Sequence, residues 1–236
     1  MLESDLLAFL ITTILALGWL RLNDYFAHRG WVSSRVSRKI IHMGTGPIFV
    51  LCWLLFPDNH ISRFVAAIIP LGITIQFALV GLGIMKDQSA VEAMSRSGDR
   101  KEILRGPLFY GIVFVVLTIW FWKTSPIGII ALMLLCGGDG LADIIGKRYG
   151  SWKLPWSSEK SIAGSMAFFC GGLVFATLVV GIYSGLKIWN NSPREFFLPI
   201  TVIALLATAV ESLPFRDIDN ISVPAIAVIL GFLILP

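Results

Sequence analysis

The chain has 236 residues, of which 56% are hydrophobic and 14% charged, and its mean hydropathy is +0.80. Soluble proteins average about 25% charged residues, so this composition excludes an ordinary soluble domain and predicts an integral membrane protein. The net charge of +4 calls for no nucleic-acid partner, because the basic residues lie where membrane topology requires them.

Apolar segments that approach or reach the length needed to cross a hydrocarbon core of about 30 Å recur along the chain. We identify eight: 5–20, 40–56, 64–85, 107–122, 126–145, 161–186, 196–213 and 222–235. The second, seventh and eighth are short, so seven spans are the alternative. The short connections leave no room for a soluble domain. We therefore predict one all-α polytopic domain over residues 1–236.

The basic residues predict the orientation of these spans. The connections 21–39, 86–106, 146–160 and 214–221 carry 15 of the 19 Lys and Arg residues. The positive-inside rule places these connections in the cytoplasm and both termini on the opposite side.

The second span begins with SRVSRKIIHMGTGP, in which Arg35, Lys39 and His42 share one helix face. A single histidine at this depth is commonly an interfacial residue with its polar atoms satisfied. A nearby phosphate would instead make Lys39 and His42 ligands for it. Both interpretations are open at this point.

The fifth span ends in LLCGGDGLADIIGKRYG, where Asp139, Asp143 and Lys147 form one stripe on a helix. Two carboxylates one turn apart repel each other unless a cation or a proton lies between them. Mg²⁺ suits this position, because it prefers one or two carboxylates together with phosphate oxygens and water. Arg148 adds a second basic group, and three glycines around Asp139 allow a bulky ligand to approach. The alternative is an internal Asp143–Lys147 ion pair with glycines that serve helix packing.

The connection WKLPWSSEKSIAGS, residues 152–165, is rich in charged and small residues. We expect Ser157 or Ser158 to cap the following helix, with Glu159 in its first turn. A helix start with free N–H groups beside a lysine favours an anion site, although an ordinary capped loop is the alternative. The candidate phosphate-binding residues here are Lys153, Glu159, Lys160 and Ser161.

The stretch ATAVESLPFRDIDNISVP places Glu211 inside the end of the seventh span and Asp217, Asp219 and Asn220 beyond it. An ionisable residue inside a membrane segment indicates function, whereas Asp217 also suits a solvated loop. Charged clusters thus gather on the cytoplasmic face. This pattern favours an enzyme that joins a metal-bound cytosolic substrate to a lipid. A transporter would place its polar site near the midplane.

Four motifs in order, RKIIHMGTGP, GGDGLADIIGKRYG, EKSIAGS and VESLP followed by DIDNISVP, resemble those of the phytol kinase and farnesol kinase family. The resemblance covers residues 35–228 and is greatest to the cyanobacterial and plastid phytol kinases. The family is related to dolichol kinases and, more distantly, to phosphatidate cytidylyltransferases.

This resemblance implies a kinase in which CTP, or UTP, donates its γ-phosphoryl group to a membrane isoprenoid alcohol in the presence of Mg²⁺. The expected alcohol is phytol, with geranylgeraniol and farnesol as alternatives. The product, phytyl phosphate, would feed biosynthesis of the tocopherol and phylloquinone type in a cyanobacterial-type plasma or thylakoid membrane.

The resemblance also suggests residue roles, which we state as hypotheses. The metal would be held by Asp139, Asp143 and Asp219, and Glu211 or Asp219 would accept the proton of the alcohol. The expected nucleotide and phosphate ligands are Lys39, His42, Lys147, Arg148, Lys153, Glu159, Lys160, Ser161 and Asn220.

One difference from the related cytidylyltransferases helps to choose between the alternative functions. Cytidylyltransferases of this superfamily carry Lys–Asp and His–Gly–Gly signatures near the last spans, whereas the corresponding stretch here reads ESLPFRDIDN. Phosphoryl transfer to an alcohol is therefore favoured over nucleotidyl transfer to phosphatidate. A membrane transporter is the alternative from a different class.

Overall fold

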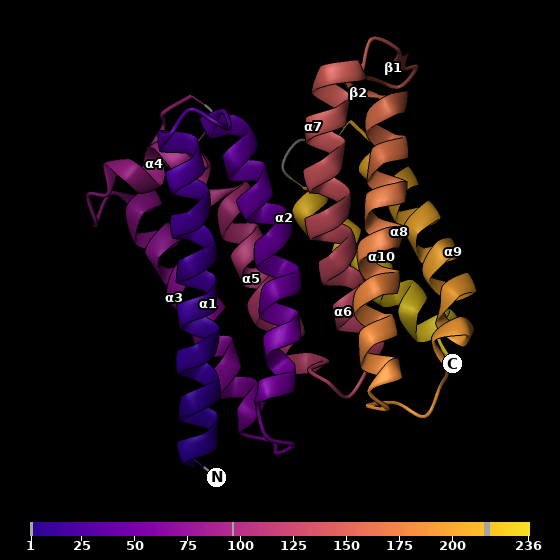
Figure 1. Cartoon of the computed structure of the whole chain (residues 1–236). Helices are drawn as coiled ribbons and strands as arrows, with labels where there is room; N and C mark the ends of the chain where they lie inside the picture. The colour runs from indigo at the N-terminus through magenta and orange to yellow at the C-terminus, as the bar shows by residue number, and fades with distance from the viewer. Residues whose placement is uncertain (1, 96, 215–217) are drawn as a thin grey trace.

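The computed structural model describes residues 2–95, 97–214 and 218–236, and they form helices joined by short connections (Figure 1). Asp217 and the side chain of Arg35 lie outside the described residues. In chain order the elements are α1 (Leu2–His28), α2 (Ser34–Cys52), η1 (Trp53–Leu55), α3 (Ser62–Leu82), α4 (Gln88–Met94), η2 (Arg100–Leu104), α5 (Gly106–Trp120), α6 (Pro126–Met133), η3 (Leu134–Gly138), α7 (Asp139–Tyr149), β1 (Lys153–Leu154), β2 (Ser157–Ser161), α8 (Ile162–Gly185), α9 (Pro193–Glu211) and α10 (Asp219–Ile234).

The helices confirm the prediction of an all-α, multi-pass membrane protein. Within the described residues, six helices are long and apolar enough to cross a bilayer. Two shorter apolar helices, Lys39–Leu55 and Asp219–Ile234, correspond to the second and eighth predicted segments. The seventh segment, which looked short in the sequence, forms a helix of 19 residues in α9 and belongs to the long set.

The helices run up and down, so that their connections collect at two ends of the bundle. Figure 1 shows both termini toward one end, and α4 and the β1–β2 hairpin at the other end. Neighbours along the chain pack together in the pairs α1–α2, α7–α8, α8–α9 and α9–α10. The described parts of the connections predicted to be cytoplasmic therefore lie at one end.

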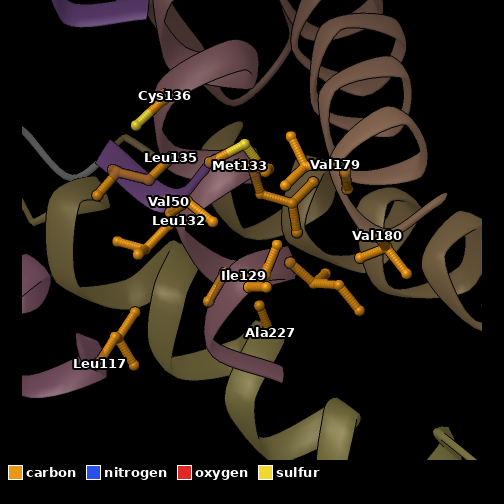
Figure 2. Packing of buried hydrophobic residues seen from close by; sticks show 14 of the residues in the cluster. Val50, Leu117, Ile129, Leu132, Met133, Leu135, Cys136, Val179, Val180 and Ala227 are labelled. Atoms are coloured by element: carbon orange, nitrogen blue, oxygen red, sulfur yellow. The ribbon is translucent and has the colours of Figure 1, made fainter. Parts of the chain in front are cut away.

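The centre of the bundle is α6 with the short helix η3, whose residues from Ile127 to Gly138 are all buried. A helix that is apolar on every side is typical of such a central position. Figure 2 shows Ile129, Leu132 and Met133 packed among Val179 of α8 and other buried side chains from neighbouring helices. This core fixes the element that leads directly into the first acidic residue of α7.

Between α6 and α7 the chain forms one π-helical turn, Leu134–Gly138. Single π turns inside α-helices are rare and often occur at functional sites. The turn ends immediately before Asp139, so α7 begins with a carboxylate at its first residue. The sequence showed one continuous apolar span here and did not predict this turn.

The hairpin β1–β2 replaces the helix start that we predicted at Ser157 or Ser158. Ser157 pairs with Leu154, and Ser161 pairs with Lys153, so both predicted caps lie within β2, as does Glu159, which we expected in the first turn of the helix. The α8 helix instead begins after Ser161, whose hydroxyl accepts a hydrogen bond from the Gly164 N–H at 3.1 Å. The predicted cap was therefore wrong by a few residues, because backbone pairing with β1 holds 157–161 extended.

Glycines allow the η3–α8 contact, and this gives a test of the packing. A Cβ at Gly171 of α8 would lie 2.6 Å from the Gly137 carbonyl oxygen, which is backbone and cannot rotate away. Gly171→Ala should therefore destabilise the protein by about 1–3 kcal/mol. Gly181→Ala, in the same helix but with open space around it, is the matched control. Thermal unfolding of detergent-solubilised protein measures both, and equal melting temperatures would contradict this packing.

Candidate active site

Lys39 of α2 lies between the two acidic residues of α7. Its Nζ donates a hydrogen bond to Asp139 Oδ2 at 3.2 Å and lies 3.9 Å from Asp143 Oδ2. All three side chains are about one-fifth exposed, so each charge is largely removed from water. The positive charge of this ammonium group offsets the repulsion expected between the two carboxylates. The same contacts join α2 to α7.

Close approach of the two helices is possible because Gly140 has no side chain. A Cβ at this position would overlap the side chain of Met43, which lies one turn after Lys39 on α2. The glycine that follows Asp139 thus serves helix packing, as one of the sequence interpretations expected.

His42 faces the same carboxylate from the next turn of α2. Its Nε2 lies 3.5 Å from Asp139 Oδ2 and makes no hydrogen bond within the described residues. Its ring packs against Tyr110 of α5 with centroids 4.3 Å apart, and the Tyr110 hydroxyl donates to the His42 carbonyl oxygen at 3.3 Å. The imidazole is thus held with a buried, unpaired nitrogen beside Asp139.

Asp143 has a second basic partner, since Lys147 forms an ion pair with it one helical turn along α7. The internal ion pair that the sequence offered as an alternative is therefore present. It occurs together with the Lys39 contact, so it does not remove the acidic pair from the site.

A second cluster forms around Lys160 of the hairpin. Its Nζ contacts Glu211 at the end of α9 and lies 3.2 Å from Asp219 Oδ2 at the start of α10. Glu211 is only 4% exposed, and its Oε2 has no hydrogen-bond partner within the described residues. One lysine thus holds together three elements that are far apart in the sequence, and one buried carboxylate oxygen is left unbound.

The charges around Lys160 keep it protonated. Burial alone would lower the pKa of its ammonium group, but Glu211 and Asp219 outweigh this effect and raise the pKa above its usual value. Asp139 contributes to the same rise, so the two clusters lie close enough to interact electrostatically. Together they place acids and lysines from α2, α7, β2, α9 and α10 in one region.

The remaining predicted residues lie around this region without joining the ion pairs. Arg148 is exposed and stacks over the Tyr149 ring at 5.4 Å. Lys153 and Glu159 are exposed, and Lys153 Nζ lies 3.4 Å from the Glu159 carbonyl oxygen. The Ser161 hydroxyl is used in the α8 cap, and Asn220 donates to the Gly106 carbonyl oxygen at 3.2 Å.

Two residues at the site had no signal in the sequence. Tyr110 is an aromatic residue within an apolar span, so only the fold reveals that it supports His42. Trp156 stands in the quoted hairpin segment, and its indole N–H donates to the Ser212 carbonyl oxygen at 3.0 Å. This bond joins the hairpin to the end of α9.

The donor set suits a divalent cation at Asp139 and Asp143. Within the described residues no three His, Cys, Asp or Glu side chains form a metal-binding group, so a cage made of protein ligands alone is not present there. Two carboxylates that share one ammonium ion can instead share Mg²⁺, which commonly uses one or two carboxylates and takes its other ligands from phosphate and water. A hollow of about 380 Å³ near Trp189 lies at the opposite end of the bundle and contains none of these side chains.

Comparison with known proteins gives a consistent set of relatives. The chain is 39% identical over 236 residues to a probable chloroplastic phytol kinase of Triticum aestivum, covering 99% of this chain and 79% of that protein. It is 36% identical to the chloroplastic phytol kinase 1 of Arabidopsis thaliana, covering 87% and 68%, and 35% identical to the chloroplastic farnesol kinase of the same plant, covering 98% and 76%. No protein-family model and no solved structure matches the chain.

The Lys160 cluster predicts a stability effect. Lys160→Met should destabilise the fold on the order of 3 kcal/mol, because it leaves the buried Glu211 carboxylate without its partner. Lys153→Met, at an exposed position of the same hairpin, should change the free energy of unfolding by less than about 0.5 kcal/mol. Thermal unfolding in detergent tests the pair, and equal stability of the two variants would show that Lys160 does not hold the hairpin against α9.

Proposed function

The chain belongs to the phytol and farnesol kinase family, and from this premise we propose that it transfers the γ-phosphoryl group of a nucleoside triphosphate to the hydroxyl of a membrane isoprenoid alcohol. We propose CTP, or UTP, as the donor and phytol as the acceptor, with farnesol and geranylgeraniol as the related alternatives. The product would then be phytyl phosphate, an intermediate for tocopherol and phylloquinone-type biosynthesis.

The observation that supports this proposal best is the meeting of two charge clusters at one end of a membrane bundle. Phosphoryl transfer depends mainly on positioning and on neutralising charge, so acids that bind a metal and lysines that bind phosphate are sufficient groups. Lys39, Lys147 and Lys160 provide the positive charges, and each contacts at least one candidate carboxylate. The isoprenoid tail would remain in the bilayer, where each buried CH₂ stabilises it by about 0.8 kcal/mol.

We assign Mg²⁺ to Asp139 and Asp143, where it would neutralise the triphosphate oxygens, with Asp219 as the further candidate ligand. Lys39, Lys147 and Lys160 would bind phosphate oxygens, with His42 beside them. Glu211 is the preferred acceptor for the proton of the alcohol, because its Oε2 is buried and has no hydrogen-bond partner within the described residues. A base in this position would be the last residue of α9 and would lie next to Lys160.

The proposed site lies on the cytoplasmic face, with both termini on the other side. The distribution of basic residues and the common end of the bundle for α4 and the hairpin support this orientation (Figure 1). The relatives are named as chloroplastic proteins, which agrees with a cyanobacterial-type plasma or thylakoid membrane as the location. We also propose that residues 1–236 act as one catalytic domain.

A transfer assay tests the proposal and separates it from its alternatives. Membranes that contain the protein should move label from γ-labelled CTP to phytol in the presence of Mg²⁺. A cytidylyltransferase would incorporate label from α-labelled CTP into a lipid, and a transporter would transfer neither label. Failure to label any isoprenoid alcohol from γ-labelled CTP or UTP would overturn the proposed function.

In the same assay, Asp139→Asn and Asp143→Asn should each lower turnover at least about 100-fold, because one carboxylate alone holds the metal poorly. Glu3→Gln, an exposed carboxylate at the far end of α1, is the control and should keep wild-type turnover. Near wild-type activity of both aspartate variants at limiting Mg²⁺ would show that the metal does not bind to this pair.

A further inference from the structure

The side chain of Trp156 is exposed, and a hydrogen bond also fixes its position. Its side chain is 55% exposed, while its indole N–H donates to the Ser212 carbonyl oxygen at 3.0 Å and lies 3.3 Å from the Ser212 hydroxyl. Trp152 in the same hairpin is 77% exposed, and its indole makes no hydrogen bond within the described residues. The hairpin thus carries one anchored and one free tryptophan.

The anchor places the Trp156 ring beside the proposed phosphate site. Ser212 directly follows Glu211, the partner of Lys160. Lys160 itself is four residues after Trp156, a separation of at most about 13 Å along a strand. The Lys160 N–H donates to the Ser157 hydroxyl at 3.2 Å, which keeps this segment in a defined shape. The indole of Trp156 and the ammonium group of Lys160 therefore both contact the end of α9.

Because the indole N–H of Trp156 is bonded to Ser212, the exposed part of this side chain is mainly ring carbon. Tryptophans that anchor proteins at a membrane interface keep the N–H at the wet end for headgroups and water. Here the N–H is turned into the protein, and within the described residues no aromatic ring or cation stacks on the indole. A fixed ring with a free face is suited to a planar ligand, because little side-chain freedom is lost when the ligand binds.

We propose that Trp156 is the nucleobase platform of this protein, on which the pyrimidine ring of the donor stacks while Lys160 binds its phosphates. This inference rests on the proposed function, because it assumes that the donor is a nucleoside triphosphate. Stacking of one base on an aromatic side chain corresponds to about a 5- to 150-fold gain in affinity. It tolerates different bases, so the platform fits both CTP and UTP.

The test compares CTP with inorganic tripolyphosphate, which has the phosphates but no base. Trp156→Ala should raise the Kd for CTP, measured by equilibrium dialysis with the full-length protein in detergent, about 10-fold or more. The Kd for tripolyphosphate and kcat at saturating CTP should stay within about twofold. Trp156→Phe keeps an aromatic face but loses the N–H bond that fixes the ring, so it should recover only part of the CTP affinity. Trp152→Ala is the matched control and should bind both ligands like the wild type.

Three results would contradict the proposal that the nucleobase stacks on Trp156. Equal weakening of CTP and tripolyphosphate in Trp156→Phe would mean that the indole N–H only holds the hairpin in place. Unchanged CTP binding in Trp156→Ala would show that the indole does not contact the base. CTP affinity of Trp156→Phe as weak as that of Trp156→Ala would exclude stacking. Failure of the kinase proposal is distinguishable, because wild-type protein would then bind CTP through Trp156 but transfer no γ-label to any alcohol.

Discussion

The ion pair between Lys39 and the two aspartates of α7 is the interaction on which the candidate site depends. Buried charges in a membrane protein are costly unless they are paired, and the side chains of Lys39, Asp139 and Asp143 are each about four-fifths buried. Lys39 lies 3.2 Å from Asp139 and 3.9 Å from Asp143, and Lys160 likewise pairs with Glu211 and Asp219. The buried charges of these two clusters are therefore brought together with partners of opposite sign.

The same pairs suit the proposed chemistry, because they can exchange partners without leaving a buried charge alone. Asp139 and Asp143 would stay neutralised if Mg²⁺ replaced Lys39 as their partner, and Lys39 would then be available to phosphate oxygens. The surrounding fold keeps these groups in place: Gly140 lets Met43 approach, the π turn precedes Asp139, and Ser161 fixes the start of α8. A site of this kind needs positioned charges more than a deep cavity.

The sequence predicted those features that depend on local pattern. Apolar length identified the membrane helices, and the i, i+4 spacing placed Asp139 and Asp143 on one helix face. The charge bias of the connections predicted that the clusters gather at one end. The pairing of Lys160 with Glu211 and the supports that Tyr110 and Trp156 provide were not predicted, because these contacts join residues far apart in the sequence. The hairpin and the π turn are local features that were also not predicted, since their residues fit a capped loop and a continuous apolar span equally well. The residue pattern within a single helix does not indicate which lysine pairs with which carboxylate on another element.

The most direct test of this account is a double-mutant cycle between Lys39 and Asp139. The free energy of unfolding is measured in detergent for Lys39→Met, Asp139→Asn and the double variant. If the two side chains neutralise each other between α2 and α7, the double variant should be more stable than the sum of the single effects predicts, by at least about 0.5 kcal/mol. Strictly additive effects would show that the pair contributes nothing to the fold, and would contradict the account of the site as a set of mutually neutralised charges.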